Sequence, residues 1–274
     1  MRPVDALPSL PALDVRRDPV DPAVLVVRLD DPDRRNVMSQ TMTASWRQLV
    51  SALADSDDVR VVVLTGAGSA FSAGGDLSWL GGGTGEGAAV DGLRLRMARY
   101  YEDWLALRGL GLPVVVAVNG PAVGAGLGLA LAGDIRLLAS SAHLSVPFTT
   151  LGLHPGMGVT HTLVAAVGRA VATELLLTGR RVGAEEAVRL GLATAVHPDD
   201  GLLDAALVTA RLVASHAPVA TRLTVQALAA GGHGDLTAAL RWESLAQAVT
   251  LASADLAEGL AAQRERRAPR FTGR

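Results

Sequence analysis

Short apolar runs alternate with longer amphipathic segments over the first 150 residues of the chain. The runs at 24–29, 59–64 and 114–118 are apolar apart from Arg28 and Arg60 and are mostly rich in β-branched residues, which is typical of strands buried on both faces of a sheet. Ser39 is placed to cap a helix that extends to about Ala54, with apolar residues on one face. A further helix is expected over 90–108. Strands that alternate with helices predict an α/β fold.

The second half of the chain has a more helical pattern. A helix is expected over 126–132, followed by short strands at 135–139 and 143–146. From Gly158 onwards the pattern is helical to the end, with one helix closing at 174–177 and another over 184–190 capped by Gly191. The first 22 residues contain prolines and acidic residues and predict an irregular arm. We therefore divide the chain into this arm (1–22), an α/β core (23–197) and a C-terminal helical region (198–274).

Composition and charge exclude several classes of function. The net charge of −2 and the aromatic content of 3% offer neither the basic surface nor the stacking platforms of a nucleic-acid-binding protein. The sequence contains no cysteine and no lysine, which removes thiolate and lysine Schiff-base chemistry. The histidines have no metal-ligand spacing with carboxylates, so we expect no metal. We find no apolar run long enough to span a bilayer and no apolar signal-peptide centre, and we expect a cytoplasmic protein.

Two glycine-rich segments carry the candidate chemistry. Residues 70–76 (Ala-Phe-Ser-Ala-Gly-Gly-Asp) follow one apolar run, and residues 119–126 (Asn-Gly-Pro-Ala-Val-Gly-Ala-Gly) follow another. Two such turns on neighbouring strands can direct two backbone N–H groups at one oxygen, which is the requirement of an oxyanion hole. Either turn alone is a common strand-to-helix connection. A dinucleotide-binding fingerprint at 124–126 is disfavoured because the acidic residue expected some twenty residues further on is absent.

These two segments, in this order and at this separation, resemble the enoyl-CoA hydratase/isomerase (crotonase) superfamily. The likeness continues from about Val24 to Arg274. It implies a crotonase (ClpP-like) α/β fold of repeated ββα units with a C-terminal α-helical oligomerisation subdomain. It also implies a homotrimer or a hexamer built as a dimer of trimers. The apolar content of 202–212, 223–228 and 245–260 supports an interface, because it exceeds what peripheral helices bury alone.

The resemblance also implies a catalytic oxyanion hole and a coenzyme A site. The backbone N–H groups of Gly75 and Ala125 would be the two oxyanion donors. Backbone groups around Ala73, Asp76 and Leu77 would hold the adenine ring. Coenzyme A would then be part of an acyl-CoA substrate, and no cofactor would be bound permanently.

Two of the implied contacts have equally simple alternatives. Arg34 or Arg35 would meet a phosphate of coenzyme A through a charge-assisted bond, but each is equally consistent with a solvated surface charge. Asp76 is better explained as a cap of the following turn than as a base.

The glutamates that hydratases of this superfamily use are missing. Alignment on the flanking residues places Gly128 and Phe148 at the two positions, and Gly156 at a third position that holds a glutamate in some isomerases. His154 is the best remaining proton carrier, because an unperturbed imidazole titrates near neutral pH; the alternative is a structural histidine. Glu102 and Asp103 are more consistent with a solvated helix face.

The side chains that would contact the acyl group remain open. Phe148, Met157 and Trp79 are candidates for an acyl pocket, although ordinary core packing is the default explanation for each. We therefore predict an acyl-CoA thioester enzyme that stabilises an enolate between Gly75 and Ala125 and lacks standard hydratase activity. The alternative is an acyl-CoA binding protein that keeps the fold and has lost catalysis.

Overall fold

A parallel sheet forms the centre of the molecule in the computed structural model, which describes residues 4–7, 9–76, 78, 89–229 and 234–274. Its order is β1 (Leu13–Arg17), β2 (Val24–Leu29), β3 (Val61–Gly66), β4 (Val114–Val118), β6 (Ile135–Ala139) and β9 (Ala195–His197). Neighbouring strands run parallel except β1 and β2, which are antiparallel. The glycine-rich segments follow β3 and β4, which are adjacent, so the sheet brings them to the same edge.

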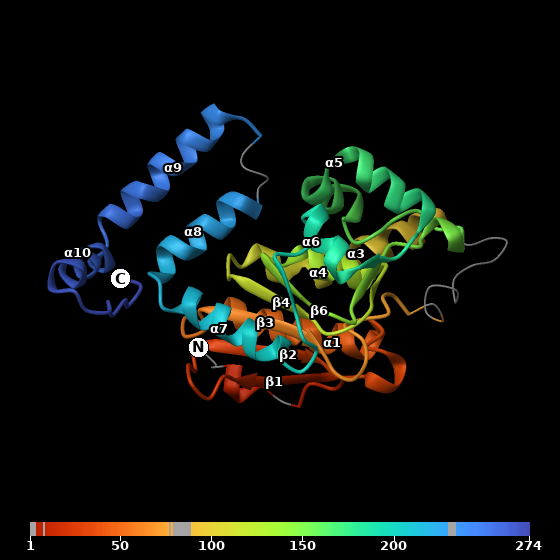
Figure 1. Cartoon of the computed structure of the whole chain (residues 1–274), viewed down its shortest axis with the longest axis horizontal. Helices are drawn as coiled ribbons and strands as arrows, with labels where there is room; N and C mark the ends of the chain where they lie inside the picture. Colours follow the sequence, from red (N-terminus) through yellow and green to blue (C-terminus); the bar gives the residue numbers. More distant parts are fainter. Residues whose placement is uncertain (1–3, 8, 77, 79–88, 230–233) are drawn as a thin grey trace.

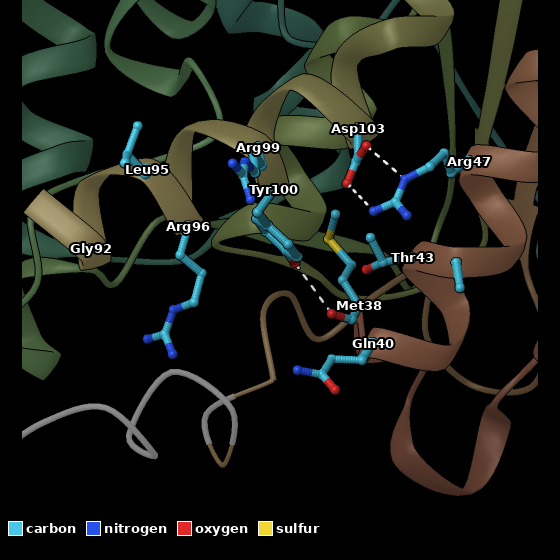
Figure 2. A pocket seen from close by; sticks show the side chains of 11 residues that line it. Met38, Gln40, Thr43, Arg47, Gly92, Leu95, Arg96, Arg99, Tyr100 and Asp103 are labelled. Atoms are coloured by element: carbon cyan, nitrogen blue, oxygen red, sulfur yellow. Dashed lines mark hydrogen bonds and ion pairs between the residues drawn. The ribbon is translucent and has the colours of Figure 1, made fainter.

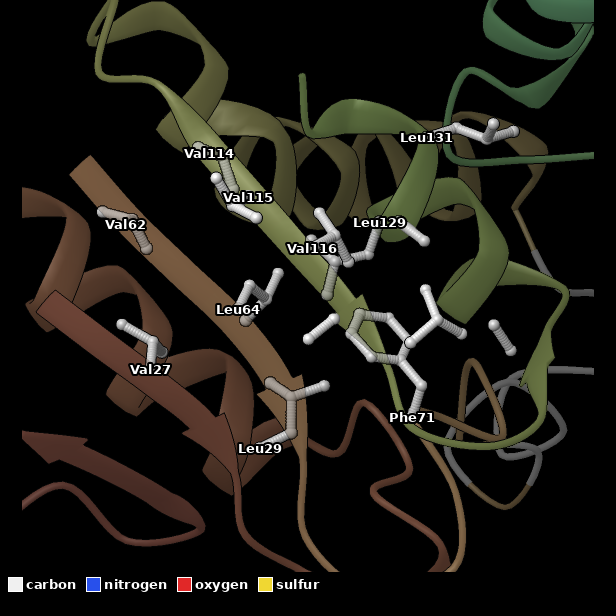
Figure 3. Close-up of a cluster of buried hydrophobic side chains, with 14 of the residues drawn as sticks. Val27, Leu29, Val62, Leu64, Phe71, Val114, Val115, Val116, Leu129 and Leu131 are labelled. Carbon is white, nitrogen blue, oxygen red and sulfur yellow. The ribbon is translucent and has the colours of Figure 1, made fainter. Parts of the chain in front are cut away.

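The apolar runs form the middle of this sheet, as the sequence predicts. Every residue of β3 and of β4 is buried. Figure 3 shows side chains of β2, β3 and β4 packing with Phe71 and with Leu129 of α4 in one cluster. Burial on both faces explains why these strands are continuously apolar instead of alternating.

A second, three-stranded sheet holds the turn that follows β4. Its order is β5 (Ala122–Val123), β7 (His143–Ser145) and β8 (Val182–Gly183). β5 runs parallel to β7, and β7 runs antiparallel to β8. The second glycine-rich segment is therefore fixed on both sides, by the central sheet before it and by this small sheet within it.

Helices cover the sheet, and α1 (Gln40–Ala54) forms as predicted. Met42 N donates to the Ser39 hydroxyl at 3.2 Å, which caps the helix, and Trp46 on its buried face stacks on Trp104 of α3 (Val90–Gly109) at 5.0 Å. The remaining helices are α4 (Ala125–Ala132), α5 (Val159–Thr178), α6 (Ala184–Leu190), α7 (Leu202–Ala214), α8 (Pro218–Ala229), α9 (Leu236–Leu251) and α10 (Ala254–Glu265), with short 3-10 turns at Val4–Ala6, Pro32–Arg34 and Thr149–Leu151.

Two expectations about the ends of the core were wrong. The arm at 1–22 is not irregular throughout, because β1 pairs with β2 as an edge strand. The region after Gly158 is not helical to the end, because β8 and β9 lie within it and β9 pairs with β6. Strands of two to five residues carry too few positions for a periodic pattern, and an edge strand tolerates charges and nearby prolines.

The C-terminal helices divide into two groups. α7 packs against β2, β3, β4 and β6, and it buries Leu202, Ala206, Ala210 and Ala214 on the sheet. α7 therefore belongs with the core, although it lies beyond the expected limit at residue 197. α8, α9 and α10 extend away from the sheet in Figure 1, and α8 and α9 have no buried residue within their described lengths.

One helix has the length and composition of a membrane span, contrary to our expectation. α5 has 20 residues and a mean hydropathy of 1.2. Its backbone leaves the helical conformation at Gly168 (φ 74°, ψ 165°), so it is two shorter helices in sequence. Each half is shorter than the roughly 20 residues that cross a bilayer. α7 and α8 pass the same test only as one span, and they are bent by 112°.

Candidate active site

The two glycine-rich turns lie side by side. Val123 N donates to Ser72 O at 3.0 Å, and Ser72 N donates to Pro121 O at 3.2 Å, so backbone bonds join the turns directly. A Cβ atom added at Gly74 would lie 2.5 Å from Val123 O and 3.2 Å from Ala125 N, and Gly74 has a φ of 91°. Only glycine fits a position with this φ and this approach. Gly74 therefore sets how closely the first turn approaches the start of α4.

The second turn begins α4. Gly124 (φ 55°) donates its N–H to Ser145 O at 2.9 Å, and Ala125 is the first helical residue. A Cβ atom at Gly126 would lie 2.5 Å from Ser72 O, so this glycine also permits contact with the first turn. Ala125 has helical backbone angles, at which an alanine is unstrained. The unpaired N–H groups and the dipole of α4 favour negative charge here.

The amides of Gly75 and Ala125 are available to an external oxygen. In the part of the chain that the structure describes, neither N–H donates to a protein acceptor. Gly75 is held by an isolated bridge to Met38, whose N–H donates to Gly74 O at 2.8 Å. The first-turn amide is thus positioned by Met38, which precedes α1, and the second by α4. Their role as oxyanion donors stays a prediction.

Asp76 is a cap, as its place in the sequence favours. Its Oδ1 accepts from Ser78 N at 3.0 Å and from Ser78 Oγ at 2.6 Å, and its Oδ2 accepts from Arg34 at 2.8 Å. The Ser78 hydroxyl, followed by the Arg34 guanidinium, lowers the pKa of Asp76 to about 2. Asp76 is therefore ionised at neutral pH and is bound by its neighbours.

The other predicted coenzyme A contacts lie around this carboxylate. Arg34 remains 50% exposed despite its bond to Asp76. Ala73 is exposed, and its N–H donates to Arg35 O at 2.8 Å. Leu77, like Trp79, falls outside the described residues. These coenzyme A contacts stay predictions.

Side chains close two of the three positions at which the sequence resemblance implies glutamates. A Cβ atom at Gly128 would lie 2.6 Å from Met157 Cβ. One at Gly156 would overlap the Tyr101 hydroxyl and lie 2.9 Å from Tyr101 Cζ. Phe148 is half-buried, and its ring lies 3.7 Å from the Cβ position of Gly124, beside the start of α4. Met157 and Phe148 therefore both adjoin α4; Met157 is buried in the core, and the acyl pocket stays a prediction.

The predicted proton carriers are exposed or half-buried. His154 is exposed, and its Nδ1 lies 2.8 Å from Pro155 O, to which it donates in the tautomer that leaves Nε2 free to accept a proton. Glu102 is exposed. Asp103 pairs with Arg47, at 2.9 Å and 2.6 Å. Glu102 is consistent with the solvated face that the sequence favours, whereas the Asp103 side chain is only 21% exposed and is held by Arg47.

A cavity of about 520 Å³ lies between α1 and α3, and no pattern in the sequence predicts it. Figure 2 shows Arg96, Gln40 and the Arg47–Asp103 pair among the side chains that line it. The Tyr100 hydroxyl, also in the lining, donates to Met38 O at 3.2 Å. Gly75 and Ala125 do not line it. Among the described lining residues, Met38 links the cavity to the first turn, because its N–H donates to Gly74 O.

Among the described residues, no group of three or more His, Cys, Asp or Glu side chains is placed to hold a metal ion.

Comparisons with known proteins identify the family. A family model described as "Enoyl-CoA hydratase/isomerase" matches residues 20–274. The "Probable enoyl-CoA hydratase EchA14" of Mycobacterium tuberculosis is 42% identical over 252 residues, which cover 90% of this chain and 96% of that protein.

Solved structures share the fold. An enoyl-CoA hydratase from Bacillus anthracis superposes with a TM-score of 0.86 at 33% identity, covering 96% of this chain and 100% of the other. An enoyl-CoA hydratase from Polaromonas gives 0.85 at 29% identity, covering 95% and 99%. The predicted crotonase fold and superfamily are confirmed, and the chain belongs to the enoyl-CoA hydratase/isomerase family.

Proposed function

We propose that this protein is an acyl-CoA thioester enzyme that stabilises an enolate with the backbone N–H groups of Gly75 and Ala125. The observation that carries the proposal is the close approach of the two turns at Gly74, with 3.2 Å from its Cβ position to Ala125 N. The names of the relatives, which are enoyl-CoA hydratases, support a thioester substrate.

The proposed chemistry begins at the thioester carbonyl. Loss of a proton from the α-carbon moves the electron pair of the C–H bond toward the carbonyl oxygen, which becomes negative. Two fixed N–H donors and the N-terminus of α4 stabilise that charge. The proton passes to a base, for which His154 Nε2 is the proposed acceptor. Addition of water needs a second acid–base group, and Gly128, Phe148 and Gly156 supply none.

Binding of the coenzyme A moiety is proposed at the first turn. Backbone groups around Ala73, Asp76 and Leu77 would hold the adenine. Arg34 would meet a phosphate, since half of its side chain stays exposed while Asp76 holds the guanidinium. A charge-assisted bond of this kind weakens as salt concentration rises.

A second candidate function is acyl-CoA binding without catalysis. Met157 and Tyr101 support it, because they occupy the space that side chains at Gly128 and Gly156 would need. Exchange of α-protons separates the two functions, since only an enzyme accelerates it.

Replacement of His154 by alanine is the first test. We expect the unmodified protein to exchange the α-protons of butyryl-CoA in D₂O, and His154→Ala to lower that rate about 10²–10⁴-fold because a positioned base is lost. The affinity for butyryl-CoA should stay the same. Proton NMR measures the exchange, and calorimetry measures the affinity.

His161→Ala is the matched control, because His161 is also exposed and lies on α5. Unchanged exchange in His154→Ala would make His154 a structural residue. Tight binding with no exchange in the unmodified protein would favour the binding function.

We also propose that the chain assembles as a homotrimer or a hexamer in the cytoplasm. The described parts of α8 and α9 expose large apolar side chains, including Leu228 (70%), Leu236 (73%) and Leu245 (63%). Such surfaces usually mark interfaces. Light scattering should give about three or six times the chain mass of 28.2 kDa, and a stable monomer at micromolar concentration would contradict the assembly.

A further inference from the structure

Tyr101 lies beside the candidate site, although nothing in the sequence singles it out. Its ring is on α3, and its hydroxyl reaches the backbone of Gly156, where a Cβ atom would overlap it. The next residue, Met157, lies against Gly128 in the first turn of α4. Gly128 is three residues after Ala125, a rise of about 4.5 Å along the helix. The Tyr101 hydroxyl therefore lies against residues 156–157, which pack on the first turn of α4 next to the proposed oxyanion donor.

The neighbouring tyrosine shows what a structural hydroxyl looks like in this helix. Tyr100 is buried, and its hydroxyl donates to Met38 O at 3.2 Å. Tyr101 is half-buried, and its hydroxyl has no hydrogen-bond partner in the described part of the chain. A hydroxyl that loses water when a ligand enters must find a new partner or lose free energy.

The Tyr101 hydroxyl is suited to donate. Burial raises the pKa of Tyr101, so the phenol stays protonated at neutral pH. Met157 follows Gly156 directly and Leu105 lies beside Gly158, so the neighbouring side chains on this segment are apolar. A ligand oxygen would satisfy the hydroxyl, whereas a purely hydrocarbon chain would leave it unpaired.

We propose, on the basis of the proposed function, that Tyr101 determines specificity by donating a hydrogen bond to an oxygen of the acyl chain. The preferred substrates are then acyl-CoA thioesters that carry a keto or hydroxyl oxygen a few carbons beyond the thioester. A site built to bond a substrate oxygen discriminates against the analogue that lacks it, because the site's own polar group is left unpaired.

The test compares hexanoyl-CoA with its 3-oxo, 4-oxo and 5-oxo derivatives, by calorimetry on the full chain. We expect at least one oxo derivative to bind roughly 2- to 10-fold more tightly than hexanoyl-CoA, as one neutral hydrogen bond provides. Tyr101→Phe should remove that preference and leave the affinity for hexanoyl-CoA unchanged. Tyr100→Phe is the matched control and should keep the preference.

Two results would overturn the inference: binding of hexanoyl-CoA with no oxo preference, or a preference that persists in Tyr101→Phe. Failure of all four thioesters to bind would refute the proposed function itself, and this inference with it. A measurement on the unmodified protein covers the case in which Tyr101→Phe does not fold. The ¹³C resonance of a labelled keto carbon in the preferred derivative should move downfield on binding, and an unmoved resonance would contradict the hydrogen bond.

Discussion

Replacing Ala125 by proline is expected to lower the rate of α-proton exchange about 10²–10³-fold while the protein stays folded. Proline has no N–H, so the substitution removes one proposed oxyanion donor. Ala125 is the first residue of α4, a position that proline favours, and its N–H has no acceptor in the described part of the chain. Gly124 precedes it, and glycine tolerates the restriction that a following proline imposes.

Ala125→Gly is the control for this experiment, because it changes the side chain and keeps the N–H. We expect it to retain exchange within a few-fold of the unmodified rate. NMR in D₂O gives the rates, and thermal unfolding verifies the fold of both variants. Exchange at the unmodified rate in a folded Ala125→Pro protein would show that this amide is not an oxyanion donor.

Installing a glutamate at Gly128 is expected to destabilise the protein without creating a hydratase. The new Cβ atom would lie 2.6 Å from Met157 Cβ and 3.2 Å from Val159 Cγ1, in a buried part of α4. Overpacking of this kind costs about 1–3 kcal/mol, and burial of an unpaired carboxylate adds to that cost. Denaturation in urea measures the loss of unfolding free energy.

A second substitution should relieve the first. Met157 is buried and has a φ of 56°, a conformation that favours glycine, so Met157→Gly opens the space without backbone strain. We expect Met157→Gly to cost less stability in the Gly128→Glu protein than in the unmodified chain, which is the non-additivity of residues in contact. A Gly128→Glu protein as stable as the unmodified chain would show that Met157 does not close this position.

The elements that the sequence predicts well are those with a strong local signal. Five apolar residues among the six of β2 identify that strand, and the Ser39 hydroxyl marks the start of α1. β8 and β9 have two and three residues, and they exist because β7 and β6 offer partners far away in the sequence. The fold of such short strands depends on tertiary pairing, which no local pattern contains.

Some residues of the candidate site likewise have a local signal in the sequence, and others do not. The glycines at 74 and 124 identify both turns, because close backbone approach and positive φ leave a mark in the sequence. The closing of Gly156 by Tyr101 leaves no such mark, since the two residues are 55 positions apart and meet only through the packing of α3. Tyr101 and the cavity beside Met38 were missed for this reason.

Two thioesters of the same length, butyryl-CoA and crotonyl-CoA, test most directly whether the unmodified protein stabilises an enolate without being a standard hydratase. We expect exchange of the α-protons of butyryl-CoA, because the two amides stabilise an enolate. We expect hydration of crotonyl-CoA, followed by loss of the conjugated thioester absorbance, to be about 10²–10⁴-fold slower for each missing acid–base group than in a hydratase that has both glutamates. Hydration of crotonyl-CoA at an ordinary hydratase rate would contradict the loss of the acid–base groups. Absence of α-proton exchange in butyryl-CoA would contradict the stabilisation of an enolate.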